Sequence, residues 1–178
     1  MKLTFRTTAV SILLVTAGLF GAFVSRAADP IRVMLLDGES AGNYHQWKLV
    51  TPVLKKQLDE TGLFQVDVVT APPAGGDFTS FKPDFARYQV VVFNYDAPDD
   101  RWPAALKASF EKYMQDGGGF VSVHAADNAF PNWVAFNEMI GIGGWRNRTA
   151  AAGPLWYYKD GKVISDTTQG RAGSHGRR

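Results

Sequence analysis

The chain has 178 residues, enough for one domain of ordinary size, and it has no cysteine, which excludes disulfides and thiolate chemistry. Its formal net charge is +2, but Lys2, Arg6 and Arg26 lie in the first 28 residues, which carry no acid. Without these three, 16 of the 19 cations remain against 17 acids, so the net charge becomes −1. Nothing in this balance points to a nucleic-acid partner.

Residues 1–28 have the pattern of an export signal. Two cations precede an apolar run at 9–24, and small residues around Arg26 suit cleavage. We therefore expect a signal peptide at 1–28, a mature domain at 29–178 without a stable membrane span, and a periplasmic or secreted location. The alternative is an uncleaved N-terminal membrane anchor, although the apolar run is shorter than the roughly 20 residues that cross a bilayer.

The mature part alternates apolar strands with amphipathic helices. The predicted elements are strands at 31–36, 64–69, 88–93 and 120–123, helices at about 48–61, 102–115 and 132–139, and a C-terminal hairpin at 155–158 and 163–165. Leu49, Val53, Leu54 and Leu58 are expected to form the buried stripe of the first helix. The strands are apolar on both faces, which favours a parallel sheet covered by helices. This order predicts a doubly wound α/β sheet.

The stretch 117–130 is the centre of the functional prediction. Three glycines end a helix, a short apolar strand follows, and His124 stands at the end of that strand. Two alanines come next, then Asp127 or Asn128 as the expected N-cap of a further helix. Open α/β sheets place ligand chemistry at this edge. His124 is therefore the leading candidate for a catalytic residue, and the alternative is a structural hydrogen bond at the strand end.

Other polar residues follow neighbouring strands. His45 comes after the first strand by way of a polar loop, and Asn94, Tyr95 and Asp96 come directly after the third. The carboxyl ends of parallel strands lie along one edge of a sheet, so His45 and His124 should approach each other. Asn94 and Tyr95 are predicted to bind substrate at the same edge.

Two kinds of chemistry suit these residues, because imidazole transfers protons near neutral pH and also binds divalent transition metals. In the first, His124 is a general acid or base that Asp127 or Asp37 holds in place. In the second, His45, His124 and His175 bind a metal such as zinc. No His-Glu-x-x-His spacing supports the metal, so the acid–base hypothesis is the stronger one. Loop hydrogen bonding for His45 and a mobile tail for His175 remain the alternatives.

Tryptophan and arginine side chains near residue 145 suggest a ligand-binding loop. The indole of Trp145 suits the apolar face of a sugar, and the guanidinium of Arg146 suits its oxygens or a carboxylate. The alternative is an exposed loop with one tryptophan in the core. Trp102 and Trp133 are predicted to be packing residues.

A series of motifs in this order resembles the ThuA-like (trehalose utilisation) domain. The motifs are IRVMLL at 31–36, YHQW at 44–47, VVVFNY at 90–95, the stretch 117–130, GGWR at 143–146, GP at 153–154, DGK at 160–162 and GSHG at 173–176. The resemblance implies a flavodoxin-like, class I glutamine amidotransferase-like three-layer sandwich with a mainly parallel sheet. His124 stands where those amidotransferases carry a cysteine nucleophile, so glutamine hydrolysis by a thiol is excluded.

The resemblance also implies a role in carbohydrate utilisation, with trehalose, a related sugar or a keto-sugar as the small-molecule substrate. The expected activity is that of a sugar-processing hydrolase, lyase or isomerase. His124, His45 and Asp127 are the catalytic candidates, and Trp145 and His175 join the substrate contacts. A non-catalytic sugar-binding or interaction module, or an inactive fragment, is the alternative, and a homo-oligomer is left open.

Two departures from the family pattern qualify this expectation. Some relatives carry a histidine in the loop after the Gly-Gly motif, where this chain has Arg148. The family domain also normally continues past the Gly-Ser-His-Gly motif, so the chain resembles a copy whose C-terminal part is missing.

Overall fold

The computed structural model describes residues 29–40, 45–141 and 154–166. Four parallel strands form the main sheet in the order β2-β1-β3-β4. The strands of this sheet are β1 (Ile31–Asp37), β2 (Phe64–Thr70), β3 (Val90–Phe93) and β4 (Gly119–Ser122). The helices are α1 (Trp47–Asp59), α2 (Ala104–Gln115) and α3 (Val134–Ile140), with 3-10 turns η1 (Phe85–Arg87) and η2 (His124–Asn128). The predicted order of strands and helices is confirmed.

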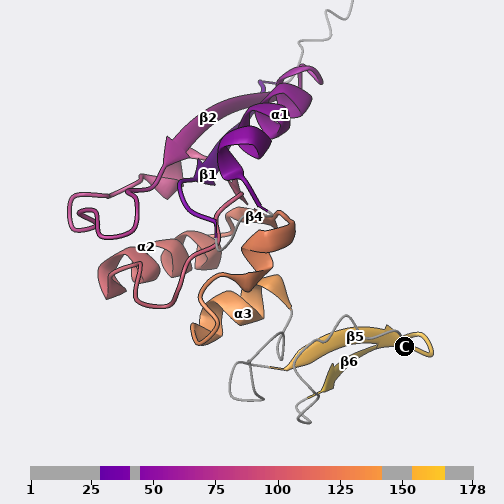
Figure 1. Cartoon of the computed structure of the whole chain (residues 1–178). Coiled ribbons are helices and arrows are strands. Elements are labelled where there is room, and N and C mark those ends of the chain that lie inside the picture. Colours follow the sequence, from indigo (N-terminus) through magenta and orange to yellow (C-terminus); the bar gives the residue numbers. More distant parts are fainter. Residues whose placement is uncertain (1–28, 41–44, 142–153, 167–178) are drawn as a thin grey trace, which may run out of the picture.

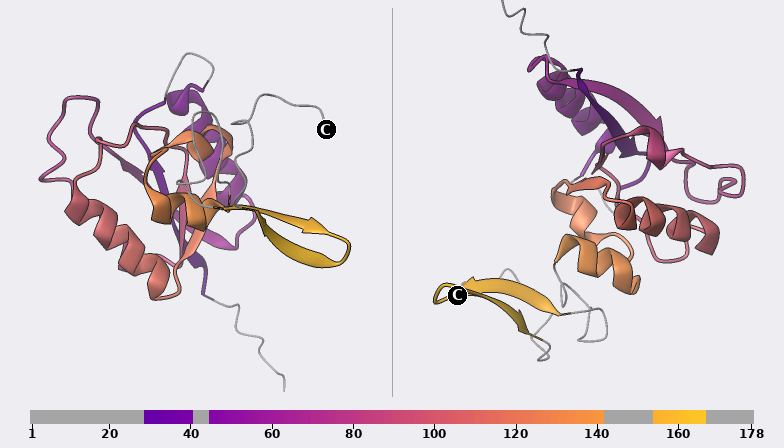
Figure 2. Two further views of the ribbon diagram at one scale, coloured as in Figure 1. Left: turned by 90° about the horizontal axis from the view of Figure 1, so that it is seen from below. Right: turned by 180° about the vertical axis from the view of Figure 1, so that it is seen from behind.

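Helices cover the two faces of the sheet unequally, as Figures 1 and 2 show. Leu54 and Leu58 of α1 pack on one face against the buried aliphatic residues Val33, Leu35 and Val92. The other face packs against α2 and α3 through a larger, mainly aromatic core. The result is the expected three-layer, flavodoxin-like arrangement, in which buried parallel strands need cover on both sides.

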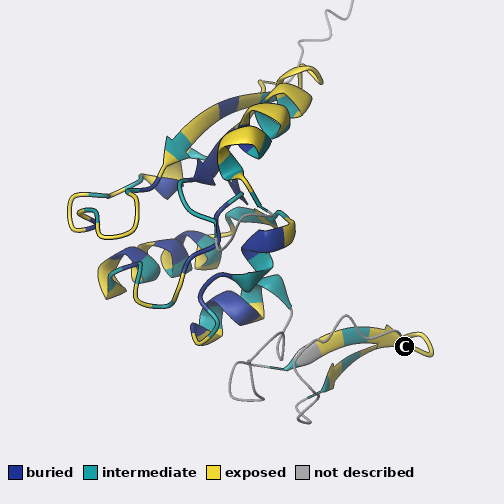
Figure 3. Cartoon of the chain, viewed as in Figure 1, coloured by how far each residue is buried: buried dark blue, intermediate teal, exposed yellow. Residues whose placement is uncertain are grey.

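The aromatic core centres on four fully buried phenylalanines: Phe93, Phe110, Phe130 and Phe136. The rings of Phe93 and Phe110 stack with their centroids 5.2 Å apart. Trp102 and Trp133 are buried in the same cluster, so their prediction as packing residues is confirmed. Figure 3 shows buried stretches alternating with more exposed ones along α2 and α3.

The predicted buried stripe of α1 is only half right. Leu54 and Leu58 pack on the sheet, but Leu49 is 65% exposed and Val53 is 54% exposed. The helix instead buries Thr51, whose hydroxyl accepts a hydrogen bond from the side chain of Asn94. The polar residue Thr51 is thus buried on α1, where the hydrophobic pattern predicted burial of Leu49 and Val53.

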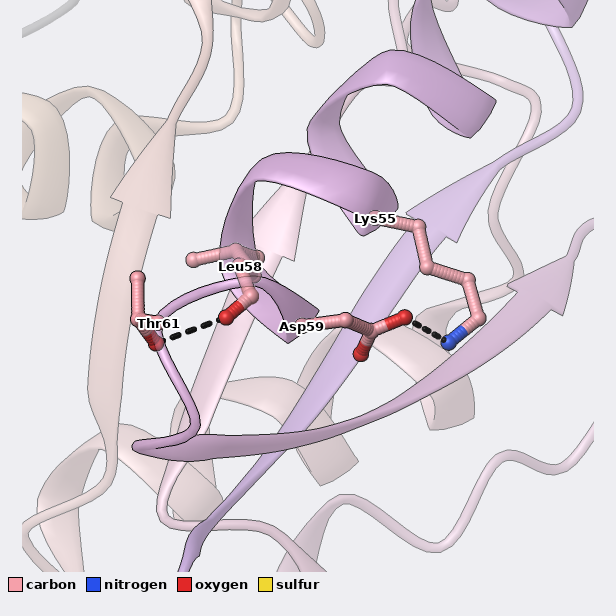
Figure 4. A network of polar contacts seen from close by, with 4 residues as sticks. All are labelled: Lys55, Leu58, Asp59 and Thr61. Atoms are coloured by element: carbon pink, nitrogen blue, oxygen red, sulfur yellow. Dashed lines mark hydrogen bonds and ion pairs between the residues drawn. The ribbon is translucent and has the colours of Figure 1, made fainter.

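Local hydrogen bonds end α1 (Figure 4). The Thr61 hydroxyl donates to the Leu58 carbonyl at 2.7 Å, and the ammonium of Lys55 pairs with the carboxylate of Asp59 at 2.6 Å. The chain then turns at Gly62, which adopts a φ of 67°. The Thr61 hydroxyl and the backbone amides of residues 60–62 satisfy carbonyl groups that a helix leaves unpaired at its C-terminus, and the chain then returns to the sheet for β2.

The strand before His124 is less buried than predicted. Val121 is 48% exposed, because β4 is the last strand of the sheet within the described residues and α1 does not cover it. Glycine is needed just before this strand, since a Cβ at position 118 would lie 2.2 Å from the ring of Tyr113. That ring packs in the core, and its hydroxyl donates to the carbonyls of Gln89 and Gly119.

The segment after β4 also differs from the prediction. The chain enters the 3-10 turn η2 at His124 itself, so Asp127 and Asn128 lie inside a turn and are not the N-cap of a helix. Helix α3 starts later than expected, at Val134. Two small buried residues, Ala125 and Ala126, allow the turn to begin without an intervening loop.

The C-terminal hairpin is confirmed. Strand β5 (Leu155–Lys159) pairs antiparallel with β6 (Lys162–Asp166) around Asp160 and Gly161. Both turn residues have positive φ, as a two-residue type I′ turn requires. Within the described part of the chain, no helix is long and apolar enough to cross a membrane.

Candidate functional site

His124 occupies a strained position at the carboxyl edge of the sheet, the edge where the four parallel strands end. The Val123 amide still bonds to the Phe93 carbonyl at 2.9 Å, and the chain turns at the next residue. His124 has a φ of 48°, which is uncommon for a residue other than glycine, and its side chain is exposed. Strain of this kind persists where the surrounding structure imposes it, and it is frequent at functional sites.

His45 lies against His124. It precedes α1 by two residues and is half-buried. The centroids of the two imidazole rings are 4.6 Å apart, and the ring planes meet at 68°, which is an edge-to-face contact. The parallel sheet therefore brings together two side chains that are far apart in the chain, as the strand order predicted. We call His45 and His124 the histidine pair.

Asn94 connects the end of β3 to the first turns of α1. Its side-chain amide donates to the Thr51 hydroxyl at 3.0 Å and to the Trp47 carbonyl at 3.5 Å. The amide nitrogen that was predicted to bind substrate thus holds the helix that follows His45. Asn94 is half-buried, and its predicted contact with substrate remains a prediction.

Asp37 lies beside Asn94 across the sheet, since Leu36 of β1 pairs with Phe93 of β3. Its side chain is 1% exposed, and its Oδ1 atom has no hydrogen-bond partner in the described structure. Strand alternation turns it toward α1, on the same face as Val33 and Leu35. Burying a carboxyl group whose oxygens are not all hydrogen-bonded costs folding free energy. Apolar packing therefore does not explain why an aspartate occupies this buried position.

Asp127 lies three residues after His124 within η2, and it is half-buried. Side chains three residues apart lie on the same side of a 3-10 helix. The predicted partnership of this carboxylate with His124 is therefore compatible with the local geometry, and it remains a prediction.

Tyr95 does not lie at the open part of the edge. Its side chain is 1% exposed, and its ring packs near Trp102 and Phe130 with centroids 6.0 and 6.2 Å away. Burial raises the pKa of the Tyr95 phenol, so the group stays protonated. Residues 91, 93 and 95 alternate onto the aromatic face of the sheet, and this pattern turns Tyr95 away from Asn94 and from a ligand at the histidine pair.

An ion pair that sequence analysis missed joins two loops of the carboxyl edge. The guanidinium of Arg101 forks onto the carboxylate of Glu39, with N–O distances of 2.5 and 2.8 Å. Both side chains are largely buried. The two residues are 62 positions apart, so no local spacing signals the contact. It ties the loop after β1 to the segment that leads into α2.

A metal site needs more ligands than the histidine pair supplies. No group of three or more histidine, aspartate or glutamate side chains in the described residues is arranged to hold a metal ion. His175, the third predicted ligand, lies outside those residues, as do Trp145, Arg146 and Arg148. The described part of the site thus brings two imidazoles together at the carboxyl edge, the edge where Asn94 and Asp37 also lie.

Comparison with known proteins agrees with this architecture. The sequence model of the ThuA family, described as trehalose utilisation, matches residues 32–169. The chain belongs to the ThuA family. A search of curated proteins found no match.

Two crystal structures of ThuA-like proteins are similar to this chain. The one from Parabacteroides merdae shares 44% sequence identity with a TM-score of 0.69, over 84% of this chain and 52% of that chain. The one from Bacteroides uniformis shares 24% identity with a TM-score of 0.48, over 68% of this chain and 48% of that chain. The chain therefore spans about half the length of the ThuA-like structures that it matches.

Proposed function

We propose that this protein is a sugar-processing enzyme whose histidine pair transfers protons at the carboxyl edge of the sheet. The observation that carries the proposal is the 4.6 Å contact between His45 and His124, with His124 held at positive φ and exposed. The ThuA family description, trehalose utilisation, supports a carbohydrate substrate. The substrate class that we propose is trehalose, a related sugar or a keto-sugar.

The proposed chemistry is general acid–base catalysis. A neutral imidazole accepts a proton from the substrate, and a protonated imidazole donates one to an oxygen that becomes a hydroxyl. In the proposed reaction one imidazole of the pair acts as the base and the other as the acid, so the two roles lie side by side. Such a pair suits a hydrolase, lyase or isomerase that moves protons without an outside reductant or oxidant.

Positive φ at His124 supports the assignment of the primary role to this residue. The turn η2 begins at His124, whose side chain is exposed, and the two residues that follow, Ala125 and Ala126, are small and buried. A substrate could therefore approach the exposed ring from the solvent side. His45 is half-buried, whereas His124 is exposed, so we assign His45 the assisting role.

The test is turnover of mono- and disaccharides, including keto-sugars, by the purified full chain. His124→Ala should abolish product formation and His45→Ala should reduce it, with both variants folded by circular dichroism. Gln46→Ala is the matched control, since Gln46 is exposed and adjacent to His45. Full activity of His124→Ala would remove the catalytic assignment.

The competing function is a non-catalytic sugar-binding module. The family description, trehalose utilisation, names a sugar and no reaction, so it also fits a protein that only binds the sugar. Calorimetry against the same sugars separates the two functions: heat of binding without product favours the module, and product formation favours the enzyme.

We also propose export to the periplasm or the exterior. The basic and apolar pattern of residues 1–28 supports this. Mass spectrometry of protein recovered from the periplasm should show a chain that begins near residue 28 or 29. Retention of the complete N-terminus in the membrane fraction would favour an anchor.

A further inference from the structure

A second site lies on another part of the domain. A cavity of about 510 Å³ opens between the connection that follows β2 and the start of α2. It shares no residue with the histidine pair or with Asn94 and Asp37. Its volume is in the range of pockets that hold small organic molecules. We call it the Phe78 cavity, and its lining consists of Phe78, Thr79, Phe81, Lys82, Pro83, Pro103, Ala105, Leu106 and Ser109.

The inner wall of the Phe78 cavity is apolar and fixed by the core. Phe78 and Leu106 are buried members of the aromatic core, and Phe81 packs against it. The rings of Phe78 and Phe81 meet edge to face, with centroids 6.0 Å apart. An apolar wall of this kind favours a ligand with an apolar, preferably aromatic, body, because binding removes both surfaces from water.

The loop that forms the rim is ordered by its own hydrogen bonds. Both the backbone amide and the hydroxyl of Thr79 donate to Oδ1 of Asp77, at 2.8 and 2.6 Å. These bonds, the side-chain one first, lower the pKa of Asp77 to about 2. The loop therefore keeps its shape without a ligand, and the negative charge of Asp77 is engaged by the loop.

The only charged side chain among the lining residues is Lys82. Lys82 is exposed, and no ion pair to it is found within the described residues. Two hydroxyls, from Thr79 and Ser109, also lie on the wall. The cavity thus offers apolar surface on the inside and one cation at the rim.

From this arrangement we infer that the Phe78 cavity binds a small amphipathic anion, with an apolar or aromatic body and one carboxylate or sulfonate group. The body lies against Phe78, Phe81 and Leu106, and the anionic group meets the ammonium of Lys82. This inference goes beyond the proposed sugar chemistry and does not depend on it.

Fluorescence titration with two probes tests the inference. The anionic probe is 1-anilinonaphthalene-8-sulfonate, and the neutral one is N-phenyl-1-naphthylamine, which has the same rings without the sulfonate. The full chain should bind one molecule of either probe. Lys82→Gln should weaken the affinity for the anionic probe by about two- to five-fold, as expected for the loss of an exposed ion pair. The affinity for the neutral probe should not change. Lys159→Gln removes a charge from the hairpin and serves as the control.

A filling variant tests the location. Ala105→Trp places an indole at the cavity wall and should weaken both probes by about ten-fold, because it takes up the space that they need. Ala108→Trp is the matched control, since Ala108 is exposed on the same helix but does not line the cavity. His124→Ala should bind both probes like the unchanged chain, which separates this site from the histidine pair.

Three results would overturn the inference. The first is equal binding by Ala105→Trp and Ala108→Trp, which would place the probes elsewhere. The second is an equal loss of both probes in Lys82→Gln, which would deny the lysine a role in binding the anion. The third is binding of several probe molecules per chain that occurs only in preparations lacking the near-ultraviolet circular dichroism signal of well-packed protein.

Discussion

The two faces of the sheet are built differently. The face toward α2 and α3 buries a continuous aromatic cluster that includes Phe93, Phe110 and Phe136. Among the described residues, the cluster on the face toward α1 has four buried members, all aliphatic. Close to its carboxyl edge, the α1 face also carries the polar side chains of Asp37, Asn94 and Thr51. The aromatic face therefore provides most of the apolar burial, and the α1 face holds the polar groups that bond to the helix following His45.

This difference teaches how stability and function are separated in the domain. Apolar burial contributes roughly 25 cal/mol for each Å² removed from water, so the larger aromatic cluster should dominate folding. The polar contacts under α1 contribute about 1 kcal/mol each, but they fix the helix that follows His45. Substitutions on the two faces should therefore differ in kind: one set unfolds the domain, and the other moves the site within a folded domain.

The largest effect is expected for Phe110→Ala on the aromatic face. Phe110 is fully buried, and its ring contacts those of Phe85, Phe93 and Phe120. Its removal should cost about 3–5 kcal/mol of unfolding free energy, because the rigid neighbours cannot close the space. Urea denaturation followed by circular dichroism measures the loss. Val134→Ala, at an exposed position, should change little; equal losses in the two variants would contradict the assigned core.

Gly118→Ala should be the next most destabilising. The added methyl group would lie 2.2 Å from the Tyr113 ring, so the ring must move and its hydroxyl loses hydrogen bonds to two carbonyls. The expected cost is about 1–3 kcal/mol. Tyr113→Phe is the comparison, because it removes the hydroxyl and keeps the ring in place. If Gly118→Ala costs no more than Tyr113→Phe in the same urea series, the ring has not been displaced.

Two leucines of one helix sharpen the comparison on the α1 face. Leu54 packs on the sheet and Leu49 is exposed, although both were expected to be buried. Leu54→Ala should cost about 2 kcal/mol, at the low end for a core leucine because this residue is only partly buried. Leu49→Ala should stay within about 0.5 kcal/mol of the unchanged chain, as surface substitutions usually do. Thermal unfolding of the two variants measures the difference. A larger loss of stability for Leu49→Ala than for Leu54→Ala would support the predicted buried stripe of α1.

The same contrast shows what sequence reasoning can and cannot reach. Apolar runs predicted the strands, because parallel strands buried between helices are apolar on both faces. The meeting of His45 and His124 followed from the shared carboxyl edge. The buried face of α1 was missed, because it depends on a hydrogen bond between Thr51 and Asn94, 43 residues apart. Long-range pairs of this kind leave no periodic signal.

Other misses divide in the same way. The burial of Tyr95 was readable in principle, since alternation from Val91 and Phe93 carries it to the aromatic face. The pair of Glu39 with Arg101 was not readable, since nothing local links the two loops. The exposure of Val121 depends on β4 being the last strand of the described sheet, which is a property of topology. Sequence patterns thus predicted elements and edges, while side-chain partners required the structure.

A smaller loss of stability than for Leu54→Ala, with the most specific consequence, is expected for Asn94→Ala. The variant leaves the buried hydroxyl of Thr51 without its donor and frees the Trp47 carbonyl, at a cost of about 1 kcal/mol. The first turns of α1 should loosen, and His45 should lose its fixed contact with His124. The chain has three histidines, so the imidazole C2 proton signals in a nuclear magnetic resonance spectrum are few and can be assigned with His45→Gln and His124→Gln.

In the unchanged chain, each ring of the histidine pair lies within the ring-current field of the other, because their centroids are 4.6 Å apart. Asn94→Ala should move the His45 signal toward its position in His124→Gln, and the His124 signal toward its position in His45→Gln. Gln89→Ala is the control, since it removes a side-chain acceptor from the opposite end of β3, where Gln89 bonds to Arg32. It should leave both signals in place. Loss of stability in Asn94→Ala with unmoved histidine signals would make Asn94 a folding residue alone, and the α1 face would then have no part in positioning the pair.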